Sequence, residues 1–465
     1  MSDITKELKE KLTYKNKTVY ESLSRDTVKE AFAFAEPYKK FLDDAKTERE
    51  SVTAATKIAE KEGFVPYHFG DKLVKGGKYY YDNRGKNLFL FTVGSEPIEN
   101  GIRISASHID SPRIDLKQNP LYEDSGMAFF KTHYYGGILK YQWVATPLAL
   151  HGVIALTSGE VLNVVIGEDD SDPVFYINDL LPHLGHDVAR KPMGEAIPAE
   201  KLNVLVGSLP LEGAEDEQDS VKLAVLTLLN EKYGITEEDF LSAELSVVPA
   251  AKARDVGFDR ALVGAYGHDD RVCAYPSLRA ILDAKDSVHS LICVLADKEE
   301  IGSEGTSGMQ CDLLLDIIDA MAKAENACPA TVRANSKCLS ADVTAAYDPN
   351  FPDVFEKRNT CFLGNGVALM KFTGARGKAG SNDASAEYIA WLRRVMRDAD
   401  VVWQSGELGK VDCGGGGTVA KYIAKHNIET IDLGVPVIAM HSPFEVISKV
   451  DLYEAYKAFL AFSVL

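Results

Sequence analysis

The sequence predicts an α/β protein in which a mixed, mainly parallel sheet is flanked by helices and interrupted by an inserted β-rich domain. From about residue 250 onward, helical stretches alternate with short apolar runs, a pattern typical of parallel strands covered on both faces. The earlier run "GIRISASHID" also has the pattern of a core strand, whereas short strands and Gly or Asp turns follow it. We therefore expect a discontinuous main domain, residues 1–119 and 246–465, with residues 120–245 inserted between its two parts.

The first expected elements are a helix and a pair of strands. "TERESVTAATKIAEKEGF" begins with Thr47 and has Glu50 three residues later, a capping box that predicts a helix start, while Gly63 predicts its end. In "KYYYDNRGKNLFLFTVG", an Asn-Arg-Gly turn separates two β-rich runs. The capping box and the turn are both predicted from neighbouring residues in the sequence.

The inserted domain is expected to contain short antiparallel strands, as in "LALHGVIALTSGEVLNVVIG", an acidic loop "LEGAEDEQDS" and one helix, "SVKLAVLTLLNEKYG". Four helix–strand pairs should follow it. The helices are "RVCAYPSLRAILDA", "CDLLLDIIDAMAKAE", "DASAEYIAWLRRVM" and "GTVAKYIAKHN", and the strands are "SLICVLA", "SKCLSAD", "DVVWQ" and "ETIDL" with "PVIAMH".

Composition restricts the function. The formal net charge of −18 argues against nucleic acid as a partner, because phosphate binding needs basic patches. No apolar run reaches the roughly 18 residues of a membrane span, and "MSDITKELKEKLTYKNK" lacks the apolar segment of a secretory signal, so we expect a cytoplasmic protein. The seven cysteines form no CxxC pair, which favours reduced thiols over disulfides or a sulfur metal site.

Histidine and acidic side chains end almost every expected core strand, which is where open α/β sheets bind ligands. Alone, each histidine is more often a satisfied structural residue, and each carboxylate is typical of a turn or a helix cap. Together, carboxylates at one site repel one another unless cations compensate, and basic neighbours such as Lys298 and Arg271 are too few. Two histidines and several carboxylates without cysteine suit two Zn²⁺ or similar ions that share a carboxylate. The residues at the strand ends are His108, Asp110, His268, Asp269, Asp270, Glu299, Glu300, Asp342 and His441.

These residues lie in stretches that resemble the aspartyl aminopeptidase / aminopeptidase I family of dinuclear zinc exopeptidases. The stretches are "SASHIDSPRIDLK", "YYGGILKYQW", "GHDDRVCAY", "DKEEIGSEGTSG", "SADVTAAYDPNF", "GSNDASAEY", "CGGGGTVA" and "DLGVPVIAMHSPFE". The resemblance implies a zinc exopeptidase-like fold and a metal-dependent aminopeptidase that removes N-terminal residues from peptides. It also implies that the inserted domain dimerises the chain within a homo-oligomer, a tetrahedral dodecamer.

The resemblance also assigns roles to the site residues. Two divalent ions per chain, Zn²⁺ with Co²⁺ or Mn²⁺ as alternatives, activate a water, and Glu299 is the general base. Asp110 orients a metal-binding histidine, and the Asp269–Asp270 peptide bond is expected to be cis. The implied metal ligands are Asp269 as the bridge, His108 and Asp342 on one ion, and Glu300 and His441 on the other.

Adjacent glutamates impose a condition on the backbone. Successive side chains of a regular strand face opposite ways, so Glu299 and Glu300 reach one site only if the chain leaves strand geometry there.

The implied substrate contacts are less specific. Gly416 and Thr418 of "CGGGGTVAKYIA" would offer backbone N–H groups at a helix start, although a flexible Gly turn explains the same sequence. Lys371 stands near the position of a specificity lysine in acid-preferring relatives, with Lys378 and Arg376 as alternatives, and a solvated surface lysine explains it equally well. The preference is therefore open between acidic and neutral or hydrophobic N-terminal residues.

In the family, a histidine of the inserted domain enters a neighbouring subunit's site, and "LLPHLGHD" offers His186 or His183 for this role. Two other functions remain as alternatives. One is a non-catalytic oligomeric scaffold that retains a metal site. The other is a carboxypeptidase or deacylase of the same clan, which would need a carboxylate-binding Arg pattern that the sequence does not display.

Overall fold

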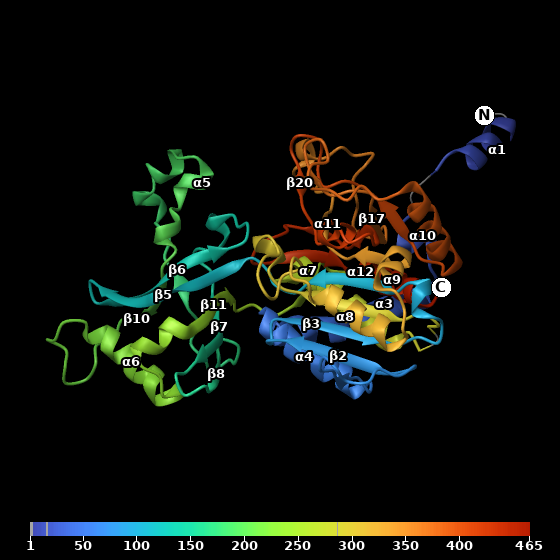
Figure 1. Ribbon diagram of the computed structural model, residues 1–465. Coiled ribbons are helices and arrows are strands. Elements are labelled where there is room, and N and C mark those ends of the chain that lie inside the picture. Colours follow the sequence, from blue (N-terminus) through green and yellow to red (C-terminus); the bar gives the residue numbers. More distant parts are fainter. Residues whose placement is uncertain (1–2, 15–16, 286) are drawn as a thin grey trace.

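The chain folds into two lobes that lie side by side (Figure 1). This computed structural model describes residues 3–14, 17–285 and 287–465. The second lobe is built on a sheet that runs from Arg113 to Pro249, and the remaining described residues form the main lobe, from which the N-terminal helix projects (Figure 1). In the described residues, no helix is both long and apolar enough to cross a membrane.

The main lobe is organised around a nine-stranded sheet whose central strands β14, β4, β15 and β21 run parallel. Antiparallel neighbours, β3 and β17, border this centre, so the sheet is mixed and mainly parallel, as predicted. In sheet order the strands are β1 (Val65–Pro66), β2 (Lys78–Asn83), β3 (Asn87–Thr92), β14 (Leu291–Ala296), β4 (Arg103–His108), β15 (Lys337–Ser340), β21 (Glu429–Gly434), β17 (Val367–Met370) and β19 (Trp403–Ser405).

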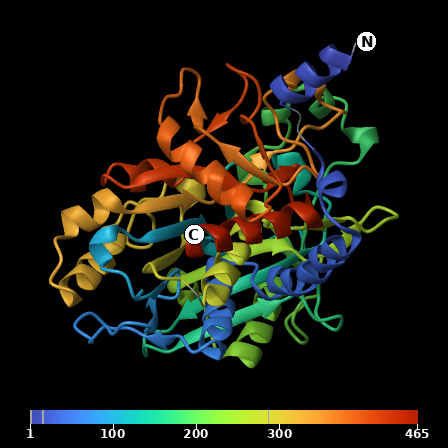
Figure 2. The same cartoon turned by 90° about the vertical axis from the view of Figure 1, so that its right-hand side faces the viewer.

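Helices cover both faces of this sheet. On one face α8 packs on Ile104 and Ala106 of β4, and on the other α4 and α7 pack on Cys293 and Leu295 of β14. Viewed from the side, α12 lies across the main lobe against α3 and α7 (Figure 2). The helices are α1 (Asp3–Leu12), α2 (Val19–Ser22), α3 (Arg25–Asp44), α4 (Glu48–Lys61), α7 (His268–Asp283), α8 (Leu313–Ala324), α9 (Pro329–Asn335), α10 (Ala386–Asp398), α11 (Ala420–Ala424) and α12 (Lys449–Val464).

Local sequence signals locate several of these elements. Thr47 and Glu50 form both bonds of the predicted capping box at the start of α4, and Gly63 has a positive φ just beyond its end. The expected helix in "GTVAKYIAKHN" forms over only part of this stretch, as α11, and Asn427 adopts a positive φ soon after the helix ends. A five-stranded sheet and a strand pair complete the main lobe: β12 (Arg254–Val256), β13 (Leu262–Ala265), β23 (Glu445–Ser448), β22 (Pro436–Ile438), β16 (Thr344–Ala345), and β18 (Gly374–Ala375) with β20 (Gly415–Gly416).

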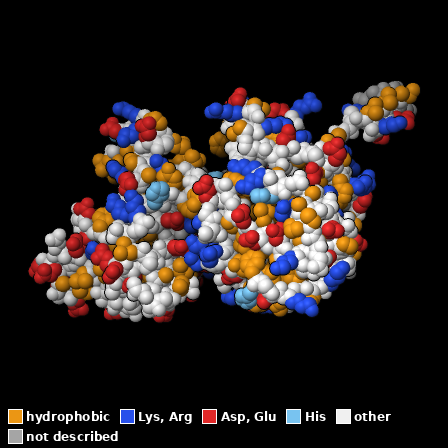
Figure 3. Space-filling view, viewed as in Figure 1, with side chains coloured by type: hydrophobic (Ala, Val, Ile, Leu, Met, Phe, Trp, Pro, Cys, Tyr) orange, Lys and Arg blue, Asp and Glu red, His pale blue; other side chains and the backbone are white. Residues whose placement is uncertain are grey.

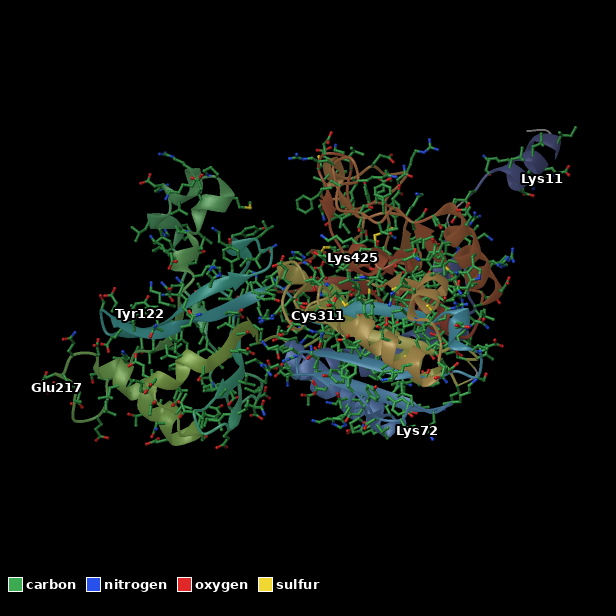
Figure 4. All side chains as sticks on the ribbon, in the orientation of Figure 1. Lys11, Lys72, Tyr122, Glu217, Cys311 and Lys425 are labelled. Atoms are coloured by element: carbon green, nitrogen blue, oxygen red, sulfur yellow. The ribbon has the colours of Figure 1, made fainter. Side chains whose placement is uncertain are left out.

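The second lobe contains an antiparallel seven-stranded sheet against which helix α6 (Ser220–Tyr233) packs, with a short α5 (Met193–Ala196) above it (Figure 1). The expected boundaries at 119/120 and 245/246 fall inside β5 and β11, two strands that lie wholly within the sheet of the second lobe. The acidic loop before α6 carries Glu217 to the far end of this lobe (Figure 4). The strands in sheet order are β8 (Val161–Ile166), β7 (Leu148–Ala155), β11 (Ala243–Pro249), β5 (Arg113–Asp124), β6 (Met127–Tyr135), β10 (Val204–Gly207) and β9 (Tyr176–Ile177).

Ion pairs join the two lobes where charged side chains of both signs meet (Figure 3). The main-lobe residues of these pairs come from the turn between α3 and α4 and from the start of α4. The pairs from these segments include Lys46 with Glu168, Arg49 with Glu244, and Glu48 with Arg113, and Lys86 in the turn between β2 and β3 also pairs with Glu244.

Candidate metal centre

The side chains predicted as metal ligands converge at the carboxyl edge of the central parallel strands. In three triads that share members, the potential ligand atoms lie within 4.8 Å of one another. His108 ends β4, Glu299 and Glu300 follow β14, and Asp342 follows β15, while Asp269 lies in the first turn of α7 and His441 lies between β22 and β23. The triads are His108–Glu299–Asp342, His108–Asp269–Glu300 and Asp269–Asp270–Asp342.

Asp269 lies between the two histidines and presents one oxygen to each. Its Oδ1 is 3.2 Å from Nε2 of His108, and its Oδ2 is 3.0 Å from Nε2 of His441. Glu300 Oε1 lies 3.4 Å from the same His441 nitrogen, and Asp342 Oδ1 lies 4.0 Å from Nε2 of His108. The peptide bond between Asp269 and Asp270 is cis, as predicted.

The hydrogen bonds of the two histidines test whether these residues fit metal ions. His108 Nδ1 lies 2.9 Å from the carbonyl oxygen of Asp110, and His441 Nδ1 lies 2.7 Å from that of Gly137. A carbonyl only accepts, so each Nδ1 carries a hydrogen, and in the neutral ring each Nε2 points a lone pair at a carboxylate oxygen.

Lone pairs of a nitrogen and a carboxylate oxygen face each other at this separation only with a cation between them. Asp269 Oδ1 is also buried without a hydrogen-bond donor. Tetrahedral Zn²⁺ with ligands at about 2.0–2.1 Å holds neighbouring ligand atoms roughly 3.3 Å apart. The observed separations of 3.0–3.4 Å match this value, so the donor set fits zinc.

Without metal, protons take the place of the cations. Burial alone would lower the pKa of His441, but its hydrogen bond to Asp269 and the nearby Glu300 raise that pKa to about 10. Burial raises the pKa of Glu299 to about 7, with Asp110 and Asp269 adding to the effect, and it raises the pKa values of Glu300 and Asp342 well above their usual range. The site therefore has a strong excess of negative charge that cations neutralise.

The chain leaves strand geometry directly before the two glutamates, as the sequence required. Lys298 has a φ of 66°, and Glu299 begins a single 3₁₀ turn. The Asp110 carboxylate accepts the backbone N–H of Glu299 at 3.1 Å and that of Glu300 at 3.2 Å. The prediction that Asp110 orients His108 agrees with the geometry, because the carbonyl oxygen of Asp110 lies 2.9 Å from Nδ1 of His108 and its carboxylate lies 3.4 Å from the same atom.

Three further residues support the site, and sequence reasoning missed them. Glu445 accepts the N–H of Asp269 at 3.1 Å through one oxygen and that of His441 at 2.7 Å through the other. Gly136 has a φ of 72°, and a Cβ there would lie 3.1 Å from Oε2 of Glu300, so a bare backbone is needed. Gly137 supplies the carbonyl that holds His441. All three lie within the quoted stretches "HSPFE" and "YYGG", but no local pattern marks them as site residues.

His268 is a strand-end candidate that the structure turns away from the cluster. Its Nδ1 bonds the hydroxyl of Tyr38 at 2.7 Å, and its Nε2 lies 3.1 Å from the carbonyl of Val263. Burial lowers its pKa to about 3, which makes it a neutral structural residue.

The expected substrate contacts have other partners. Lys371 and Lys378 both pair with Asp383, and the Thr418 hydroxyl donates to the buried Asp432 at 2.7 Å. Gly416 pairs with Gly374, while Arg376, His183 and His186 are exposed, the two histidines on the second lobe. Within the described part of the chain, no hydrogen bond or ion pair joins Lys371, Gly416, Thr418 or His186 to the metal-ligand candidates.

A mainly parallel α/β sheet with histidines and carboxylates converging at its carboxyl edge is typical of a metal-dependent enzyme, and the chemistry that such a site supports includes hydrolysis by a metal-activated water. The family model described as aminopeptidase I zinc metalloprotease (M18) matches residues 41–463, and the chain belongs to this family. A probable M18 family aminopeptidase 1 from Clostridium acetobutylicum is 49% identical over 97% of this chain and 98% of its own.

Solved structures agree with this assignment. An M18 aminopeptidase from Thermotoga maritima superimposes with a TM-score of 0.92 at 43% identity, covering 97% of this chain and 100% of its own. The yeast mApe1 dodecamer shares the fold, with a TM-score of 0.76 at 22% identity over 92% of this chain and 96% of its own. The chain is thus a zinc-dependent aminopeptidase, which the family favours over the scaffold, carboxypeptidase and deacylase alternatives.

Proposed function

We propose that the chain would hold two zinc ions in two half-sites that share Asp269. His108 and Asp342 form the inner half-site, and His441 and Glu300 form the outer half-site. The observation that carries this proposal is that the two oxygens of Asp269 face the Nε2 atoms of different histidines, whose Nδ1 atoms both face backbone carbonyls. Bound there, the ions would activate a water and polarise the scissile carbonyl.

Glu299 is the general base. Its carboxylate lies within 4.8 Å of ligand atoms of His108 and Asp342, so it adjoins the inner half-site. No hydrogen bond to its side chain occurs among the described residues, which leaves its oxygens free to take a proton from the attacking water. The same carboxylate then returns that proton to the leaving amine.

The test of this proposal is Glu299→Gln, with Glu304→Gln as the matched control. Glu304 is exposed on the same loop. We expect Glu299→Gln to keep two zinc ions and the wild-type melting temperature but to lose about 10²–10⁴-fold in kcat, the contribution of general base catalysis. Aminoacyl-anilides assayed with Zn²⁺, Co²⁺ or Mn²⁺ provide the measurement, and near wild-type kcat would remove Glu299 from this role.

A panel of such anilides also decides the N-terminal residue preference. Asp383 already pairs with Lys371 and Lys378, so an acidic substrate residue must compete with it for these lysines. If Lys371 is the specificity cation, Lys371→Ala lowers kcat/KM for Asp and Glu anilides and leaves that for Leu and Ala anilides unchanged. If Lys371→Ala changes kcat/KM equally for acidic and for neutral anilides, residues other than Lys371 determine the preference for the N-terminal residue.

We further propose that the second lobe mediates homo-oligomer assembly, into a dodecamer like that of the yeast relative. Apolar side chains gather at the upper end of this lobe (Figure 3). Light scattering of the wild type and of Leu184→Asp, an exposed position of the second lobe, tests the assignment, since a monomeric wild type would contradict it. The exposed apolar side chains include Leu139, Tyr141, Leu180, Leu181, Leu184 and Met193.

A cytoplasmic location is the remaining proposal. All seven cysteines are free thiols, including Cys311 on the main lobe (Figure 4), as expected in a reducing compartment. Cell fractionation that finds the protein only outside the cytoplasm would contradict it.

A further inference from the structure

A segment that leaves the second lobe completes the support of the metal centre. Tyr135 ends β6, and its hydroxyl donates to Asp110 Oδ2 at 2.9 Å. Asp110 is fully buried, and the same oxygen accepts the N–H of Glu300, while its Oδ1 accepts that of Glu299. Three donors therefore fix the rotation of one carboxylate, and that carboxylate holds the turn carrying both glutamates.

The ring of Tyr135 is itself held in place. The guanidinium carbon of Arg113 lies 4.0 Å from the ring centroid, a stacked cation–π arrangement. Arg113 donates to Asp115 at 2.8 Å and to Glu48 at 3.0 Å, so its plane is fixed on two sides. Because the hydroxyl points from a clamped ring, Tyr135 is a pre-oriented donor to Asp110.

We propose that Tyr135 is a positioning residue that sets the catalytic geometry of Glu299 through Asp110. This inference rests on the proposed role of Glu299 as the base. Without the hydroxyl, Oδ2 keeps only the Glu300 N–H, and the carboxylate is free to rotate and shift both backbone bonds. A displacement of about 1 Å in a catalytic group costs on the order of 100-fold in rate.

The test compares Tyr135→Phe with Tyr134→Phe, the neighbouring exposed tyrosine of the same strand. We expect Tyr135→Phe to lower kcat by about 10–100-fold, with KM within about threefold of wild type and two zinc ions retained. Tyr134→Phe should match the wild type. A purely structural tyrosine would lower the melting temperature or the active fraction without this separation of kcat from KM.

A double-mutant cycle tests the route through Asp110. If Tyr135 acts only through that carboxylate, Tyr135→Phe adds no further loss of kcat in an Asp110→Asn background. Losses that multiply in the double variant would overturn the proposed route.

Glu299→Gln in the same assay separates the two proposals. An active Glu299→Gln variant would refute the assignment of the base, whereas an inactive one beside a fully active Tyr135→Phe would refute the positioning role alone. If Tyr135→Phe does not fold, Arg113→Lys takes its place, because lysine cannot bond both acidic partners and stack on the ring. We then expect a smaller loss of kcat, about 3–10-fold, and an unchanged kcat would overturn the inference.

Discussion

His108 and His441 stand on opposite sides of Asp269, yet the fold holds them in different ways. The side chain of His108 is 2% exposed and ends a central parallel strand, whereas that of His441 is 32% exposed and lies in a loop of the smaller sheet. The carbonyl oxygen of Asp110, two residues after His108 in the sequence, fixes the tautomer of His108. That of His441 is set by Gly137, which follows the second lobe's strand β6.

The comparison indicates that the central sheet positions the ligands of the inner half-site, whereas packing between separate segments positions those of the outer half-site. Strand ends of one sheet come into register through the backbone ladder, so their ligands are fixed together. Of the outer ligands, Glu300 follows a central strand, but His441 relies on contacts between loops and between lobes. We therefore expect the outer ion to bind more weakly and to leave first.

The largest expected effect distinguishes His108→Ala from His441→Ala. We expect His441→Ala to retain about one zinc ion per chain and nearly the wild-type melting temperature. His108→Ala removes a buried group from among carboxylates and should cost about 3–5 kcal/mol in the free energy of unfolding. Zinc content after dialysis, together with thermal melts, provides the measurement.

His68→Ala is the control for these two variants, because its side chain is 79% exposed and lies outside the site. Equal zinc loss and equal destabilisation in the two site variants would show that the half-sites are equivalent.

A smaller effect is expected from Glu445→Gln, which tests how the Glu445 carboxylate holds the backbone N–H groups of Asp269 and His441. Both oxygens of Glu445 accept N–H groups, and an amide nitrogen cannot accept, so one of the two bonds must break. We expect zinc affinity to fall about 10–100-fold, the usual cost of losing a group that orients ligands. Chelator titration measures this loss, which should appear first in the weaker ion.

Glu454→Gln is the matched control, since Glu454 is also fully buried and accepts a backbone N–H, that of Val402. We expect this control to change stability without changing zinc affinity. Equal zinc affinities for wild type and Glu445→Gln would show that this support is dispensable.

Sequence reasoning was strongest where one strand or one turn carries the signal. The alternation in "GIRISASHID" and the apolar run before Glu299 marked the strand ends, and Thr47 with Glu50 marked a helix start. Because parallel strands end at one edge, these local signals also indicated that the ligand candidates meet.

The remaining features depend on contacts between distant segments. Glu445 reaches Asp269 across 176 positions of the chain, and Gly137 reaches His441 across 304. No periodicity encodes such pairs. The role of Asp110 was likewise decided by the turn at Lys298, whose positive φ brings two N–H groups toward its carboxylate.

The smallest expected effect concerns the junction on which the outer half-site depends. His151 of the second lobe bonds Glu50 of the main lobe at 2.8 Å and Glu168 at 3.1 Å. Burial alone would lower its pKa, but the hydrogen bonds to these two carboxylates raise it above the ordinary value of 6.5. Its stabilisation is therefore complete below about pH 6.5 and is lost as the pH rises through the folded-state pKa.

We expect His151→Gln to destabilise the protein by about 1–3 kcal/mol at pH 6, the contribution of charge-assisted hydrogen bonds, and by progressively less at higher pH. Melting temperatures of wild type and variant across this range give the difference directly. Since Gly137 follows the second lobe's sheet, the variant should also lose its weaker zinc ion more readily than the wild type at pH 6. A stability difference that stays constant with pH would mean that the charge on His151 does not hold the lobes together, and the outer half-site would then depend on uncharged contacts alone.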